Sequence, residues 1–227
     1  MTNMANMFFN RDEVKGLRGT TTVGLVFRDG VVIAADKRAS AGTFIASKKA
    51  QKIHPITDKI VFTISGLVAD AQILVKWIRN YIRRISIERD RPPLVREVAS
   101  VTSVLLHTNF RSLLPFLVHF IIGGIDQLGP HIFFLDHTGA AHEDKFMATG
   151  SGSPVAYGVL EANYREGIDE DEAVKLALRA LRSAIRRDTA TGDGIDLVVV
   201  KGDGLRFFKP EEIDRYLADL DKVIHEG

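Results

Sequence analysis

A glycine and three threonines, Gly19-Thr20-Thr21-Thr22, stand where a polar leader gives way to the first strongly apolar segment of the chain. A threonine hydroxyl is a poor nucleophile and needs a base beside it. If Thr20 became the first residue of a mature chain, its own α-amine would supply that base, because a free α-amino group titrates near about 7.7–8.0. Gly19 suits this junction, since a small residue lets the Thr20 hydroxyl reach the preceding carbonyl. We therefore expect the chain to cut itself between Gly19 and Thr20.

Three further residues have the chemistry to support such a nucleophile. Lys52 precedes a short apolar run, and a cation close to the Thr20 amine would lower the pKa of that amine. Asp36 ends an earlier apolar run and could hold the lysine ammonium, much as the third member of a catalytic triad orients the base. Gly66 ends a third apolar run, and its N–H is a candidate oxyanion donor because no side chain projects from its Cα.

Each of these residues also has a plainer interpretation. Threonines form strands well, single charged residues are usually solvated, and Asp36 could cap the turn after its strand. Gly66 could simply separate a strand from a helix. It is the combination of the four residues, in this order, that indicates acyl-transfer chemistry.

The elements that must position these residues follow from the hydrophobic periodicity. Short β-branched and apolar runs bounded by turn residues predict strands, over residues 20–27, 31–35, 53–56, 59–65, 116–122, 131–135, 142–149, 195–200 and 205–208. Apolar residues recurring every three or four positions predict helices, over residues 67–85, 94–113, 154–164, 171–187 and from Pro210 onward. The segment between Asp36 and Ile53 is predicted to be a loop.

The order of these elements predicts the fold class. Blocks of strands alternate with pairs of helices, which differs from the strict strand–helix alternation of a doubly wound parallel sheet. We expect an α+β protein in which two antiparallel sheets stack face to face and helices cover both outer faces. The prediction is a four-layer αββα sandwich.

Composition narrows the classes of function. The chain has 227 residues, 45% of them hydrophobic, and a net charge of +1, so no field of one sign favours nucleic acid or an anionic membrane as a partner. It contains no cysteine, which excludes disulfides, thiolate metal sites and a cysteine nucleophile. Residues 1–19 lack the apolar core of a secretory signal, and no apolar stretch approaches the roughly 20 residues of a membrane span. We expect one cytoplasmic domain after the leader.

Other motifs give weaker indications. The run from Gly150 to Pro154 resembles a phosphate-binding loop but lacks the third glycine of the dinucleotide fingerprint and a Gly-Lys-Ser/Thr ending. Three histidines, with acidic residues among them, lack the tight spacing of zinc ligands: His131, His137 and His142. Asp193-Gly194 and Asp203-Gly204 lack the order of a calcium loop. We therefore expect no metal and no cofactor.

Six segments together resemble the catalytic β subunits of archaeal-type 20S proteasomes, which are N-terminal-nucleophile hydrolases and threonine proteases. They are residues 19–24, 36–38, Lys52, 65–68, 149–154 and 187–192. The resemblance extends over residues 20–227, with the motifs in the expected order. It implies a propeptide over residues 1–19 that autocatalysis removes, followed by a single peptidase domain over residues 20–227.

The resemblance also implies a role for each matching residue. Thr20 would be the nucleophile, with Asp36 and Lys52 as its charged partners. A second group would support the threonine amine and a catalytic water: Ser151, Asp188 and Thr191. At Thr191 the family commonly has serine, and the hydroxyl is kept. Six residues would surround the side chain that precedes the cut: Ala39, Ser40, Ala50, His54, Ile64 and Val68. Because this set is small and mostly apolar, we expect cleavage after hydrophobic residues.

The implied working form is a homo- or hetero-heptameric β ring stacked with proteasome α rings, fed with unfolded polypeptides by a regulatory ATPase. Trp77 and Tyr81, beyond the main apolar stripe of their helix, could contribute to ring contacts or to an extra core face. The leading alternative is a non-catalytic ring subunit of the same fold, against which the presence of Thr20, Asp36 and Lys52 argues. An α subunit, a bacterial two-component protease subunit and a nucleotide-binding enzyme built on the Gly150 loop are less consistent with the pattern.

Overall fold

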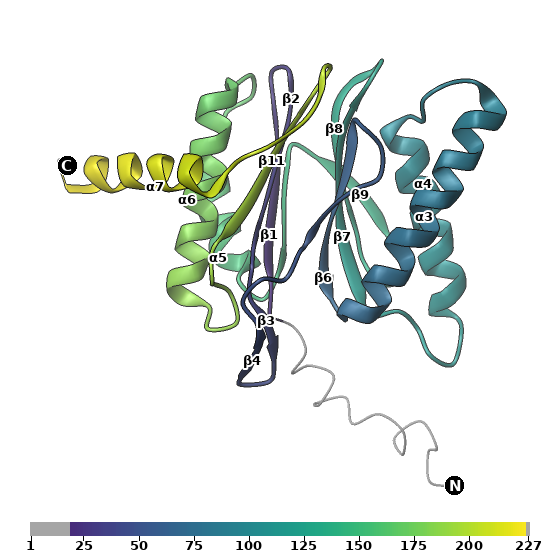
Figure 1. Cartoon of the computed structure of the whole chain (residues 1–227), viewed down its shortest axis with the longest axis horizontal. Helices are drawn as coiled ribbons and strands as arrows, with labels where there is room; N and C mark the ends of the chain where they lie inside the picture. Colours follow the sequence, from purple (N-terminus) through teal and green to yellow (C-terminus); the bar gives the residue numbers. More distant parts are fainter. Residues whose placement is uncertain (1–18, 226–227) are drawn as a thin grey trace, which may run out of the picture.

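The computed structural model describes residues 19–225, so the predicted propeptide lies outside the described residues except for Gly19. Within the described range, two five-stranded antiparallel sheets stack face to face, and helices cover both outer faces (Figure 1). The predicted four-layer αββα sandwich is therefore confirmed.

The first sheet has the strand order β10-β1-β2-β11-β12. Its members are β1 (Thr21–Phe27), β2 (Gly30–Asp36), β10 (Phe146–Gly150), β11 (Ile195–Lys201) and β12 (Gly204–Phe207). The second sheet has the order β5-β6-β7-β8-β9. Its members are β5 (Ile53–Pro55), β6 (Ile60–Gly66), β7 (Val118–Asp126), β8 (Gly129–Leu135) and β9 (Ala141–Asp144). A separate small hairpin pairs β3 (Ala39–Ala41) with β4 (Phe44–Ser47).

The helices divide between the two outer layers. The second sheet is covered by α3 (Val68–Arg89) and α4 (Val95–Phe110), and the first sheet by α5 (Ser153–Asn163) and α6 (Glu170–Arg187). The last helix, α7 (Pro210–His225), contacts α6 and runs outward from that layer (Figure 1). Among the described residues, no helix combines the length and the apolar character that a membrane span requires.

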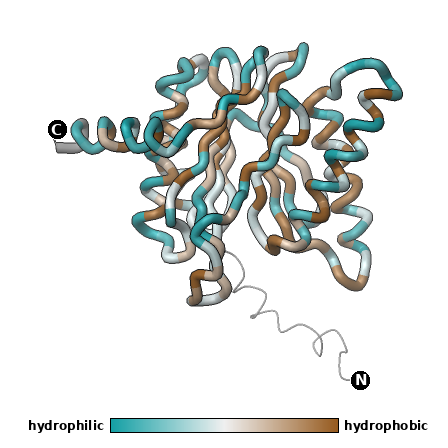
Figure 2. Tube along the Cα trace, viewed as in Figure 1, coloured by the Kyte–Doolittle hydropathy of each residue, from teal (hydrophilic) through white to brown (hydrophobic). Residues whose placement is uncertain are grey.

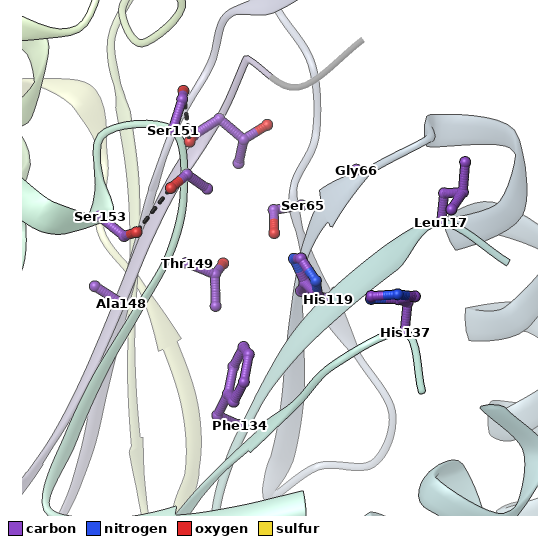
Figure 3. Close-up of a pocket in the computed structure, with 12 residues that line it drawn as sticks. Ser65, Gly66, Leu117, His119, Phe134, His137, Ala148, Thr149, Ser151 and Ser153 are labelled. Carbon is purple, nitrogen blue, oxygen red and sulfur yellow. Dashed lines mark hydrogen bonds between the residues drawn. The ribbon is translucent and has the colours of Figure 1, made fainter. Parts of the chain in front are cut away.

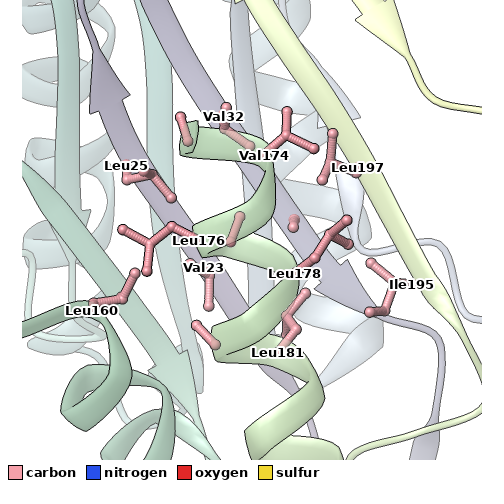
Figure 4. Close-up of a cluster of buried hydrophobic side chains, with 14 of the residues drawn as sticks. Val23, Leu25, Val32, Leu160, Val174, Leu176, Leu178, Leu181, Ile195 and Leu197 are labelled. Carbon is pink, nitrogen blue, oxygen red and sulfur yellow. The ribbon is translucent and has the colours of Figure 1, made fainter. Parts of the chain in front are cut away.

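The three central strands of the first sheet, β1, β2 and β11, are buried on both faces, which explains why they are rich in apolar residues. Successive side chains of a strand point to opposite faces. Val32 and Ala34 of β2 therefore pack in the cluster beneath α5 and α6, which Figure 4 shows, whereas Val31 and Ile33 pack between the two sheets. Figure 2 shows largely hydrophobic strands beside helices that alternate between hydrophilic and hydrophobic residues. Burial on both faces holds the ends of β1 and β2, where the predicted site lies, in a rigid frame.

Two strand predictions were wrong. Residues 142–149 form two strands instead of one, and the chain crosses between them from the edge of the second sheet, at β9, to the edge of the first, at β10. The strand predicted over residues 116–122 instead runs from Val118 to Asp126 as β7, with Gly123 and Gly124 inside it. A Cβ at Gly123 would come within 2.7 Å of Ile33 Cδ1, so close packing of the sheets requires this glycine.

The remaining differences concern boundaries and one loop. The predicted loop after Asp36 contains the β3–β4 hairpin, whose strands of three and four residues are too short and too exposed to give a hydrophobic pattern. The first helix continues to Arg89, past the predicted end at Ile85. The second helix ends at Phe110, before the predicted Leu113.

Candidate active site

Thr20 lies immediately before β1 and is almost closed to solvent, with 6% of its surface exposed. Its hydroxyl donates a hydrogen bond of 2.5 Å to the carbonyl oxygen of Gly19. This carbonyl belongs to the peptide bond that the sequence predicts to be cut. A Cβ at Gly19 would lie 1.8 Å from Ser40 Oγ and 2.8 Å from the Ala190 carbonyl oxygen. Only glycine fits at this position. Its close packing leaves the Gly19 carbonyl in contact with the Thr20 hydroxyl.

Asp36 and Lys52 meet beside this peptide bond. Asp36 ends β2 and Lys52 precedes β5, and the two side chains form a buried ion pair with 2.6 Å between Nζ and Oδ1. Burial lowers the pKa of the Lys52 ammonium, and the charge and hydrogen bond of Asp36 act in the opposite direction. Lys52 Nζ also donates to the Gly19 carbonyl oxygen over 3.5 Å. A positive charge therefore faces the carbonyl at which negative charge would develop.

Backbone groups from three segments hold the Asp36 carboxylate. The Thr21 N–H donates to Oδ1 over 2.8 Å, and the N–H groups of Arg38 and Gly192 donate to Oδ2 over 3.1 and 2.9 Å. Charge-assisted hydrogen bonds of this kind compensate a carboxylate for the loss of water. Asp36 therefore ties the start of β1, the turn after β2 and the loop before β11 together around Thr20.

The second predicted group, Ser151, Asp188 and Thr191, is also assembled. Ser151 follows β10 and Asp188 caps the end of α6, and the hydroxyls of Ser151 and Thr191 each donate to Asp188 Oδ2 over 2.5 Å. The Ser151 hydroxyl also donates to the Thr20 carbonyl oxygen over 3.4 Å. Thr191 shares a further hydrogen bond of 2.7 Å with the hydroxyl of Thr21. The hydroxyl that replaces the serine of the family thus occupies a fully bonded position.

Gly66 ends β6, and its conformation excludes a side chain. Its φ of 119° lies in the region that favours glycine, and a Cβ would come within 2.2 Å of the Leu117 carbonyl oxygen. Gly66 lies beside Thr20 in the lining of two cavities. This position is compatible with the predicted role of its N–H as an oxyanion donor.

The first cavity has a volume of about 430 Å³ and is lined by all six residues predicted to surround the substrate side chain before the cut. They are Ala39, Ser40, Ala50, His54, Ile64 and Val68. The unpredicted β3–β4 hairpin supplies one wall through Ala39, Ser40 and Ser47. Burial lowers the pKa of His54, whose Nε2 lies 3.1 Å from the Gln51 carbonyl oxygen. Small apolar residues form part of the wall, through Ala39, Ala50, Ile64, Val68 and Ala71. Polar and charged residues form the rest, among them Lys49, Lys52 and Gln72.

A second cavity, of about 460 Å³, is also lined by Thr20. Figure 3 shows Ser65, His119, His137 and Phe134 on one side of it and Thr149, Ser151 and Ser153 across from them. The two cavities share Thr20, Ser65 and Gly66. Thr20 therefore lines two cavities, which is compatible with a nucleophile that receives a peptide continuing in both directions.

Sequence reasoning missed several supporting residues. Arg38 forms an ion pair of 2.7 Å with Asp193 and donates to the Thr189 carbonyl oxygen, so it holds the loop that carries Thr191. Asp193 raises the pKa of the Arg38 guanidinium. Thr21 joins the two predicted groups, through Asp36 and Thr191. The only signal for Thr21 was its place beside Thr20, and none existed for the pairing of Arg38 with Asp193.

The weaker motifs do not come together into a second site. The run from Gly150 to Pro154 belongs to the cavity wall beside Thr20 and leads into α5. His131 contacts Glu143, with 2.6 Å between Nδ1 and Oε1, at the exposed edge of the second sheet. In the part of the chain that the structure describes, no group of three or more histidine or acidic side chains is placed to hold a metal ion.

Comparison with known proteins agrees with this geometry. The family model described as proteasome subunit matches residues 17–200. The chain is 49% identical to proteasome subunit beta of Ferroglobus placidus over 207 residues, which is 91% of this chain and 98% of the relative. It is 49% identical to proteasome subunit beta of Archaeoglobus fulgidus over 211 residues, 92% of this chain and 98% of the relative. It is 46% identical to proteasome subunit beta 1 of Korarchaeum cryptofilum over 206 residues, 90% of this chain and 98% of the relative. The chain therefore belongs to the proteasome subunit family and is of its β type.

Proposed function

We propose that this subunit is a threonine endopeptidase whose nucleophile, Thr20, is exposed by self-cleavage after Gly19. The observation that carries the proposal is the contact between the Thr20 hydroxyl and the Gly19 carbonyl oxygen, with the buried Lys52–Asp36 pair beside it. If Thr20 were only a strand residue, neither the tightly packed Gly19 nor the buried charge beside the preceding carbonyl would have a structural reason.

Self-cleavage would proceed in two steps. The Thr20 oxygen attacks the Gly19 carbonyl carbon, the C–N bond to Thr20 breaks, and the acyl group moves from nitrogen to oxygen as an ester. The hydroxyl proton ends on the Thr20 nitrogen, which becomes an amine. Water then attacks the ester, and the products are a Gly19 carboxylate, a free Thr20 hydroxyl and a free Thr20 amine. The Lys52 ammonium, 3.5 Å from the carbonyl oxygen, stabilises the negative charge that forms there.

Substrate hydrolysis uses the groups that self-cleavage leaves behind. The Thr20 amine accepts the hydroxyl proton as the oxygen attacks the scissile carbonyl, and the Gly66 N–H stabilises the oxyanion. The amine then passes the proton to the leaving nitrogen, and water releases the acyl group. Ser151, which bonds the Thr20 carbonyl oxygen, and its partners Asp188 and Thr191 keep the new terminus in place and hold the water.

The cavity that contains Ala50, Ile64 and Val68 would receive the side chain before the cut. The small apolar residues in its lining support a preference for hydrophobic residues at that position. A panel of peptides that differ only in this residue tests the preference, and faster cleavage after acidic or basic residues would contradict it.

The assembly that we propose is a homo- or hetero-heptameric β ring stacked with proteasome α rings in the cytoplasm, supplied with unfolded polypeptides by an ATPase. The relatives are named as proteasome β subunits, and proteasomes are ring assemblies. Large apolar side chains on the outer face of α3 give this proposal further support, since Ile73, Trp77 and Ile87 are 58%, 63% and 73% exposed. Exposed apolar patches of this kind mark surfaces that bind other proteins.

The experiment that tests the proposed activity is peptide hydrolysis by assembled particles that carry wild-type chain or Thr20→Ala. We expect the variant to assemble, to retain residues 1–19 and to lose hydrolysis. Hydrolysis at the wild-type rate by Thr20→Ala particles would overturn the proposed nucleophile.

A further inference from the structure

The second cavity beside Thr20 is lined in part by Ser65, His119 and His137, three polar residues that have no role in the proposed mechanism. Most hydroxyls around it already have partners: Ser151 bonds Asp188, Thr149 bonds Thr22, and Ser153 bonds the Gly150 carbonyl oxygen. The Ser65 hydroxyl is different. It belongs to a residue that is only 4% exposed, and no hydrogen-bond partner for it exists within residues 19–225.

A buried hydroxyl without a partner is costly, because it has lost water and gained nothing in return. Figure 3 shows that the Ser65 hydroxyl points into the second cavity, toward His119. A ligand in that cavity that accepts a hydrogen bond would remove the cost. The His119 and His137 rings lie next to each other in the same wall, with 5.6 Å between their centroids, and imidazole N–H groups are further donors.

The position of the cavity identifies the part of the substrate that reaches it. A peptide whose scissile carbonyl lies at the Thr20 hydroxyl continues from that point in two directions. The cavity that contains His54 and Ile64 receives the side chain before the cut, so the second cavity is left for the side chain after it. Ser151, which adjoins the new terminus, lines the second cavity and not the first, as a group near the leaving nitrogen should.

The described lining of the second cavity contains no carboxylate that would repel an anionic side chain. No lysine, arginine or acidic residue is part of its described lining, and the titratable groups there are His119 and His137. Three carboxylates lie near the lining residues, and each already accepts hydrogen bonds. Asp70 accepts from the Leu117 N–H, and Asp136 accepts from Thr138 and Ala140. Asp188 accepts from Ser151 and Thr191. Two aromatic contacts complete the surroundings, His142 against Phe134 and Phe110 against His137. The Thr20 amine, when protonated, adds a further positive charge.

We infer that this cavity binds the first substrate side chain after the scissile bond, and that Ser65, His119 and His137 select a hydrogen-bond acceptor there, a carboxylate above all. The inference rests on the proposed function of Thr20, because it assigns the two cavities to the two sides of the cut. It makes Ser65, His119 and His137 residues that determine specificity for the leaving part of the substrate.

The test uses assembled wild-type particles and internally quenched peptides with one fixed hydrophobic residue before the cut and Asp, Asn or Lys after it. We expect kcat/KM to be about tenfold higher for Asp than for Lys, as one hydrogen bond to a charged group contributes. Asn should fall between them.

Substitutions test whether Ser65 and His137 themselves cause the preference for Asp over Lys after the cut. Ser65→Ala and His137→Gln should each move the Asp-to-Lys ratio toward one. The matched variant His54→Gln, in the other cavity, should change the preference before the cut and leave that ratio unaltered. Hydrolysis that depends on Thr20 but shows a ratio near one, or a ratio that neither Ser65→Ala nor His137→Gln changes, would overturn this inference alone. Hydrolysis that persists in Thr20→Ala particles would overturn the proposed function, and with it the assignment of the two cavities.

Discussion

The Lys52 ammonium and the Asp36 carboxylate form a 2.6 Å ion pair whose side chains are 6% and 0% exposed. Removing one member of a buried pair leaves the other charge without compensation and costs about 3–5 kcal/mol, whereas removing both charges leaves neither uncompensated. We expect Lys52→Met and Asp36→Asn each to lower the free energy of unfolding and to abolish hydrolysis. The double variant should be more stable than either single variant and still inactive.

Thermal unfolding and peptide hydrolysis, measured on the same four proteins, check this prediction. If the double variant lost as much stability as the sum of the single changes, the two side chains would not act as a pair. If either single variant kept wild-type hydrolysis, the pair would have no part in the reaction.

The pH dependence of hydrolysis should reflect two groups. The Thr20 amine must be neutral to act as a base, so kcat/KM should rise as the pH passes the ordinary range of an α-amino group, about 7.7–8.0. Lys52 must stay charged, and burial lowers the pKa of its ammonium. Activity should therefore fall again below the usual lysine value of about 10.4. A pH–rate profile that keeps rising beyond that value, in enzyme shown to remain folded, would refute the role given to Lys52.

Gly19 should be needed for processing more strictly than for folding. In Gly19→Ala the new Cβ would meet Ser40 Oγ at 1.8 Å and the Ala190 carbonyl oxygen at 2.8 Å, so the Gly19 carbonyl must move away from the Thr20 hydroxyl. We expect processing, followed by intact mass, to slow by about tenfold or more, since small displacements of reacting groups cost this much. Gly158→Ala is the matched control, because a Cβ there has open space around it. Equal processing rates in the two variants would contradict the prediction.

Thr191 tests whether the second group needs a hydroxyl or a particular residue. Thr191→Ser keeps the donor to Asp188 and the contact with Thr21, so hydrolysis should stay within about threefold of wild type. Thr191→Val keeps the shape but leaves the Asp188 carboxylate and the Thr21 hydroxyl each short of a partner, which costs about 1–3 kcal/mol in a buried site. Measurements of hydrolysis and of unfolding on both variants show whether a hydroxyl at position 191 is required. A fully active Thr191→Val would show that the hydroxyl has no role.

Much of this arrangement could be predicted from the chain because the site residues lie at element ends. Asp36 and Gly66 each end a predicted strand, and Lys52 directly precedes one, so their positions follow once the strands are identified. The layer order followed from the alternation of strand blocks and helix pairs. The six residues of the first cavity came from the resemblance to a family and not from any periodicity, since Ala39 and Ser40 lie on a hairpin that has no hydrophobic pattern.

What could not be predicted depends on contacts between distant segments. Arg38 and Asp193 are separated by 155 positions, and no local pattern marks their pairing. Gly123 was misinterpreted because the same residue type serves turns and close packing, and only the Ile33 side chain opposite it decides between them. Ser65 was read as one more strand residue, although its hydroxyl has no partner and points into a cavity.

The measurement that tests the central claim most directly is the intact mass and N-terminal sequence of this chain in an assembled, peptide-hydrolysing particle. The account predicts that wild-type chain begins at Thr20 and that Thr20→Ala chain in the same assembly still begins before Gly19 and hydrolyses nothing. An active particle in which the wild-type chain still carries residues 1–19 would contradict it, because Thr20 would then have an amide nitrogen and no base.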